Sequence, residues 1–212
     1  LTLNVGDTNA KTLTLIVNTN DLTVSDIANT NAEGTFTIAI QGNGADDFLS
    51  STGTIAGTAA GKVVITGNTH GLLKLDSATT HSFTFDGAGD GQGNITSSAA
   101  VTNDEGLGTN TRMGTLTTGG GTFTNNAAVS AKVLVLGDDA NLVSDNTINI
   151  STTSSLSADI TTSGSNSITL TGTATNANAE KRTLTATGAT VDFGAGYVGN
   201  TQDLDIVGNL DL

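Results

Sequence analysis

The segment Thr35-Phe36-Thr37-Ile38-Ala39-Ile40 alternates polar or small residues with large apolar ones. Because successive side chains of a β-strand point to opposite sides, this period of two places Phe36, Ile38 and Ile40 on one buried face. The same period recurs in residues 12–17, 82–85, 147–150, 167–170, 203–206 and 209–212. No segment shows a sustained helical stripe, so the sequence predicts an all-β chain with almost no helix.

The segments between these strands are rich in Gly, Asn, Asp and Ser, which favour turns. Strand centres recur about every 10 residues, a spacing that fits both a β-sandwich and a β-solenoid. The one-sided strands and the low aromatic content, 3% with no Trp, favour the solenoid. We therefore expect a parallel β-solenoid (β-helix), with β-sandwich domains as the alternative. Turns of roughly 20 residues would give about ten levels and a rod about 50 Å long.

Composition excludes several classes of function. The chain has 212 residues, a net charge of −13, and no Cys or Pro, and about half of it is Thr, Gly, Asn and Ser. Without Cys there is no disulfide or thiolate metal site. Seven basic residues against 20 acidic ones exclude nucleic acid as a partner, since phosphate binding needs a basic face. The apolar runs are too short for a membrane span in this segment.

We expect residues 1–212 to form a single β-solenoid segment that belongs to a longer chain. Residues 1–5 and 204–212 both resemble strands in progress, and natural solenoids cap their ends. The expected partners are therefore copies of the chain, or neighbouring segments, that stack on the open solenoid ends.

The composition of the chain is well represented by one stretch near its end, Thr183-Leu184-Thr185-Ala186-Thr187-Gly188-Ala189-Thr190-Val191-Asp192-Phe193-Gly194. This Thr-, Asn-, Gly- and Ala-rich, acidic, Cys-free sequence resembles large bacterial surface proteins, above all autotransporter or haemagglutinin-like passengers and S-layer proteins. The resemblance is compositional and covers the whole chain. It implies an extracellular address at the bacterial cell surface, secretion in an unfolded state and a structural or adhesive role.

The resulting expectation is a structural extracellular surface protein without catalysis, either an adhesin passenger rod or an S-layer lattice subunit. One alternative is a carbohydrate-processing or carbohydrate-binding β-helix such as a phage tailspike, with host or matrix carbohydrate as its partner. A second alternative is a calcium-dependent β-sandwich binding module.

Calcium is the one cofactor that the sequence suggests. Its predicted ligands are Asp86, Asp90 and Asn94, in a Gly-rich loop whose part from residue 87 to 95 resembles one copy of the calcium-binding nonapeptide of RTX proteins. Weaker candidates are the loop of residues 43–47 and the group of Asp138, Asp139 and Asn141.

Three further patterns in the sequence match known kinds of functional site, but each has a simpler structural interpretation. Asp203 and Asp205 share a strand face, as paired glycosidase carboxylates would, but such acids are also usual on the outer face of a strand. His70 and His81 could meet and bind zinc, although surface histidines are the favoured interpretation. Thr-x-Thr pairs, as found on ice-binding solenoids, occur at unequal intervals, which argues against a regular ice-binding plane. They are residues 12/14, 35/37, 115/117, 122/124, 169/171 and 183/185.

Overall fold

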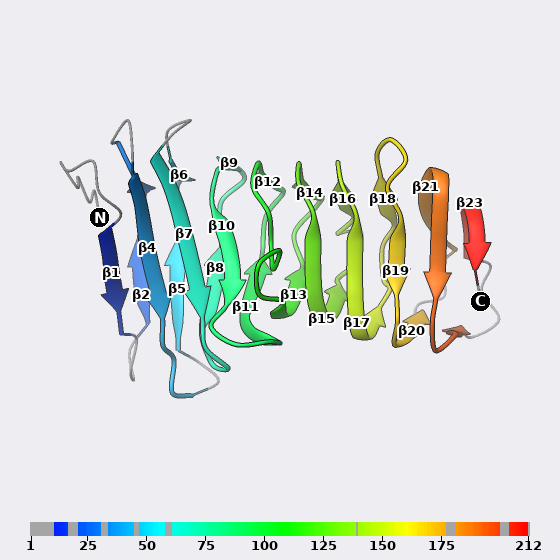
Figure 1. Ribbon diagram of the computed structural model, residues 1–212, viewed down its shortest axis with the longest axis horizontal. Coiled ribbons are helices and arrows are strands. Elements are labelled where there is room, and N and C mark those ends of the chain that lie inside the picture. Colours follow the sequence, from blue (N-terminus) through cyan, green and yellow to red (C-terminus); the bar gives the residue numbers. More distant parts are fainter. Residues whose placement is uncertain are drawn as a thin grey trace.

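The computed structural model describes residues 11–16, 21–30, 34–44, 47–57, 61–138, 140–176, 181–199 and 204–211. These residues form strands joined by turns and bends, and no helix occurs among them. The strands lie side by side along one long axis, from β1 (Lys11–Leu15) at one end to β23 (Leu204–Asp211) at the other (Figure 1). Every pairing between the described strands is parallel. The chain is thus a parallel β-solenoid, as predicted.

The chain winds repeatedly around three faces, and each face is a stack of parallel strands. The first face holds β1, β4 (Gly34–Ile40), β7 (Gly61–Gly67), β10 (Thr84–Gly87) and β19 (Ile168–Leu170). The second holds β2 (Leu22–Val24), β5 (Phe48–Ser51), β8 (Leu72–Leu75), β11 (Gln92–Ser97), β13 (Met113–Thr118), β20 (Thr173–Asn176) and β22 (Tyr197–Gly199). The third holds β3 (Ile27–Ala28), β6 (Ile55–Ala56), β9 (Thr80–His81), β12 (Val101–Asn103), β14 (Phe123–Asn125), β16 (Leu142–Ser144) and β18 (Ile160–Thr162).

Four longer strands pass from one face to the next. Strands β15 (Val129–Leu136) and β17 (Ile148–Ser155) run from the first face onto the second, and β21 (Arg182–Phe193) and β23 run from the third onto the first. The register of β15 against β17 shifts between Ala131 and Val133, where the chain turns the corner. The corners are therefore made by local irregularities as well as by loops.

A single column of apolar residues runs through every level of the first face. The residues in mutual register are Leu13, Ile38, Ile65, Phe85, Leu107, Val129, Ile148, Ile168, Val191 and Leu210. The intervals between them vary, from 27 residues between Ile38 and Ile65 to 19 between Val129 and Ile148. The turns are therefore not of one length, and the loops absorb the difference.

The interior is filled by the apolar residues that the alternation selects. In β4 the buried positions are Phe36, Ile38 and Ile40, which are 2%, 0% and 1% exposed. Aromatic rings also enter the interior: Phe83, Phe85, Phe123 and Phe193 are all at most 1% exposed. Burying such a side chain contributes about 1.5–3 kcal/mol, and this interior core is shared by all the levels.

The described residues contain no helix that is long and apolar enough to cross a lipid bilayer.

Candidate functional site

The loop predicted to bind calcium connects β10 to β11, and its glycines have a conformational role. Gly91 and Gly93 adopt φ angles of 72° and 73°, in the left-handed region that favours glycine. A Cβ atom at Gly93 would lie 2.9 Å from the carbonyl oxygen of Gly67 and 3.0 Å from the ring of Phe85. The glycine pattern of this loop therefore follows from close packing against the neighbouring level, with or without calcium.

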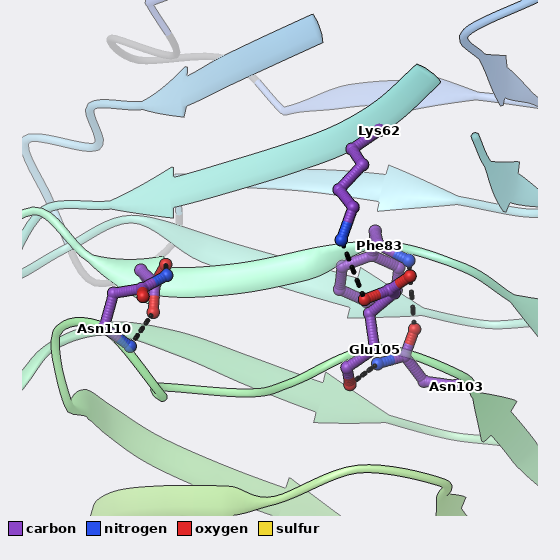
Figure 2. Close-up of polar contacts among 6 residues, drawn as sticks. Lys62, Phe83, Asn103, Glu105 and Asn110 are labelled. Carbon is purple, nitrogen blue, oxygen red and sulfur yellow. Dashed lines mark hydrogen bonds and ion pairs between the residues drawn. The ribbon is translucent and has the colours of Figure 1, made fainter. Parts of the chain in front are cut away.

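Two of the three predicted calcium ligands bind groups of the next level. The Asp86 carboxylate, 6% exposed, accepts hydrogen bonds from the backbone N–H groups of Asn110 (3.0 Å) and Thr111 (3.3 Å) and from Asn110 Nδ2 (2.8 Å). Asp90 forms an exposed ion pair with Arg112 at 2.6 Å. Asn110, labelled in Figure 2, makes the last of the bonds to Asp86 through its side-chain amide. Both aspartates thus join adjacent levels.

The third predicted ligand, Asn94, also bridges levels. Its Oδ1 accepts a hydrogen bond from the Thr115 backbone N–H at 3.0 Å, and its Nδ2 donates one to the Thr69 carbonyl oxygen at 3.2 Å. The three ligands have protein partners in this structure, and calcium binding at Asp86, Asp90 and Asn94 stays a prediction.

The other candidate side chains that the structure describes also bind protein groups. Asp47 Oδ2 accepts hydrogen bonds from the backbone N–H groups of Asn43 (2.7 Å) and Gly44 (2.9 Å). Asn141 Oδ1 accepts one from the Asp159 N–H, and Asp205 pairs with Lys181 at 2.7 Å. Asp46, Asp139 and Asp203 lie outside the described residues. Within the described ranges, no three His, Asp or Glu side chains gather as a metal-binding group.

The two histidines occupy different environments. His70 is exposed in the loop between β7 and β8, as predicted. The prediction of a surface position is wrong for His81, which is 1% exposed inside the solenoid. Its Nδ1 accepts a hydrogen bond from the Ile55 N–H at 3.0 Å, and its ring stands edge-on to Phe83. Its Nε2 has no partner among the described residues, and desolvation lowers the pKa of His81 to about 4.

His81 heads a column of buried polar side chains at the end of the third face. The residues in register are His81, Asn103, Asn125, Ser144 and Thr162, each at most 2% exposed. Asn was expected in the turns between strands, so this internal column was missed. Its signal in the sequence is a polar residue that ends each of these short strands: Asn103 in β12, Asn125 in β14, Ser144 in β16 and Thr162 in β18.

These side chains satisfy backbone groups where the chain turns from the third face to the first. Asn103 Oδ1 accepts a hydrogen bond from the Phe83 N–H, and its Nδ2 donates to the Glu105 carbonyl oxygen (2.8 Å) and to Asn125 Oδ1 (2.9 Å). Figure 2 shows Asn103 between Phe83 and Glu105, whose carboxylate also meets Lys62. Buried backbone groups require such partners, so the column is a structural element.

The second face carries a regular outer surface across five levels. We call it the threonine–valine array, because eight of its ten residues are Thr or Val. It has two outward rows of residues. On each strand, the residue of the second row follows the residue of the first row by two positions. The first row is Asn94, Thr115, Val133, Thr153 and Thr173, and the second is Thr96, Thr117, Val135, Ser155 and Thr175. All ten are half-buried or exposed, and none is charged.

A shallow hollow borders the array at its β8 end. It is lined by Thr69, His70, Leu72, Asn94, Thr115 and Thr117. None of these lining residues is a carboxylate or a lysine. The hollow therefore offers hydroxyl, amide and imidazole groups around one leucine, which is chemistry for binding a neutral polar ligand.

Replacement of Asn125 by Leu tests the structural role of the polar column. The variant removes the Oδ1 acceptor of Asn103 Nδ2 at a fully buried position, and one of the two side-chain donors to the Ala127 carbonyl oxygen. Each unsatisfied group costs about 1–3 kcal/mol, so we expect a clear fall in the urea midpoint measured by circular dichroism. The exposed neighbour Asn126→Leu is the matched control, and equal losses in both variants would contradict the assigned role.

Acid should destabilise the protein through His81. Between its folded pKa of about 4 and the ordinary value of 6.5, the unfolded chain binds a proton that the folded chain does not. Stability therefore falls as the pH drops from 6.5 toward 4, by up to about 3 kcal/mol from this group. His81→Asn should remove that part of the pH dependence, whereas His70→Asn should retain it. An NMR titration of His81 with a midpoint near 6.5 would sink this prediction.

Comparisons of the chain with protein-family models, with curated proteins and with solved structures find no match.

Proposed function

We propose that this chain is a structural, non-catalytic rod segment of an extracellular bacterial surface protein, of the kind that serves as an adhesin passenger or a lattice subunit. The observation that carries the proposal is the apolar column of ten levels, which makes the whole described chain one elongated body (Figure 1). A rod of this kind keeps the groups at its two ends at a fixed distance from each other. Its outer faces consist mainly of small polar residues. The side chains of Asp86, Asp90 and Asn94 form links between levels.

Further solenoid levels, from neighbouring segments or from copies of the chain, are the proposed partners at the ends. Within the described residues, β1 pairs with β4 alone and β23 pairs with β21 alone. The other edge of each strand offers backbone groups that can pair with an added parallel strand. The net charge of −13 opposes contact between the sides of two rods, unless a divalent cation such as calcium bridges acidic neighbours.

Carbohydrate binding is the second candidate, and the hollow beside Leu72 favours it over carbohydrate processing. A glycosidase needs a pair of carboxylates at its site, and the lining of the hollow contains none. His70, Asn94 and the threonine hydroxyls around Leu72 can instead contact the polar and apolar faces of a neutral sugar. Host or matrix carbohydrate is the proposed ligand for this candidate.

Surface location is tested with antibodies raised against the purified segment. We expect them to label intact cells of the source organism, and external protease to remove the label while a cytoplasmic marker stays protected. Labelling that appears only after permeabilisation would contradict the extracellular location. The purified protein should also release no reducing ends from a panel of bacterial and host polysaccharides, and such a release would instead support the carbohydrate-processing alternative.

A further inference from the structure

The threonine–valine array has the regularity of a lattice. Neighbouring levels of a β-sheet are about 4.8 Å apart, and alternate residues along a strand are about 6.6 Å apart. The two rows of the array therefore form a grid with these two repeats over five levels. No register shift occurs within the array, either between the levels of Thr115 and Val135 or between the levels of Thr153 and Thr175.

The base of the array is buried in the interior of the solenoid. The inward residues of its levels are Ile95, Leu116, Leu134, Ser154 and Ala174, and all are at most 3% exposed. Thr and Val have restricted χ1 angles, so their methyl groups hold defined positions on a fixed backbone. The array thus presents methyl and hydroxyl groups at fixed points.

The hydroxyl groups of the array are free to bind water. Hydroxyls elsewhere in the chain bind protein groups, such as Thr118 to the Ala140 carbonyl oxygen and Thr162 to that of Asn166. Within the described ranges, no hydroxyl of the array makes such a bond. The array also contains no charged residue, although the chain carries a net charge of −13. Charged groups would hold hydration shells of their own and disturb an ordered water layer.

These observations select a ligand that is neutral, extended and ordered, and that binds hydroxyl groups. The spacing between levels is close to the oxygen repeat along one axis of hexagonal ice. Methyl groups at fixed positions order the water around them, and hydroxyl groups join that water by hydrogen bonds. We propose that the threonine–valine array binds ice, through an ordered water layer whose oxygens match the ice lattice.

The unequal intervals of Thr-x-Thr pairs in the sequence do not exclude this function, because sequence intervals do not determine the register of the strands. Solenoid turns of different length still place their strands in register, as the steps from Thr115 to Val133 and from Val133 to Thr153 show. Of the pairs singled out in the sequence, only 115/117 belongs to the array. The pair Thr173/Thr175 was overlooked, and Val133/Val135 and Thr153/Ser155 do not match the motif.

The test is ice growth in the presence of the purified chain. We expect faceted ice crystals and inhibition of ice recrystallisation. The double variant Thr115→Lys, Thr153→Lys places charge in one row of the array, two levels apart, and should abolish both effects. The matched control is Thr124→Lys, Thr161→Lys, which makes the same change two levels apart on the third face and should keep them. Circular dichroism and melting curves verify that each variant folds.

A milder variant covers the case in which the charged one does not fold. Thr153→Ala with Thr173→Ala removes methyl and hydroxyl groups at exposed positions, and should weaken the inhibition. The proposal is overturned if the unmodified chain has no effect on ice, or if array and control variants behave alike. Adsorption to crystalline cellulose or chitin without any effect on ice would also overturn it, in favour of a polysaccharide surface.

Discussion

The structure depends on the stacking of inward side chains between parallel levels. One level of three short strands cannot bury its own apolar face, so each level is stabilised by the levels above and below it. The column from Ile38 to Val191 expresses this constraint at its simplest, because a buried apolar residue occurs at the same position of each of these levels. The loops carry no such constraint, which explains why turns of 19 and 27 residues coexist in one rod.

The same constraint explains why polar residues can stand inside the rod. At the end of the third face the chain must turn sharply, and its backbone groups there lie beyond the reach of the sheet. Asn103 and Asn125 supply the missing hydrogen bonds and also bind each other, so that the polar column repeats from level to level as the apolar column does. His81 is the member whose second nitrogen lacks a partner in the described residues, which makes this end of the column sensitive to acid.

The sequence predicted the fold class because alternation is a local property. Phe36, Ile38 and Ile40 identify their own strand and their own buried face. Register is a non-local property, and unequal loops conceal it. Hence the stacking of Thr115 on Val133 could not be obtained from intervals. The inward position of Asn125 was hidden for a different reason, since Asn is also the usual residue of turns. Side chains such as Asp86 look like metal ligands in the sequence, but their partners in the structure come from the next level.

The stacked register of the strands is tested most directly by measuring distances between stacked positions that are far apart in the sequence. Thr102 and Thr185 lie in one outward row of the third face, with Thr124, Val143 and Thr161 between them. Because the chain has no native Cys, spin labels can be attached to a Thr102→Cys, Thr185→Cys double variant alone. Four steps between levels predict a narrow distribution of label distances corresponding to about 19 Å between the two backbone positions. A broad distribution, or one centred at a much longer distance, would contradict the stacked register.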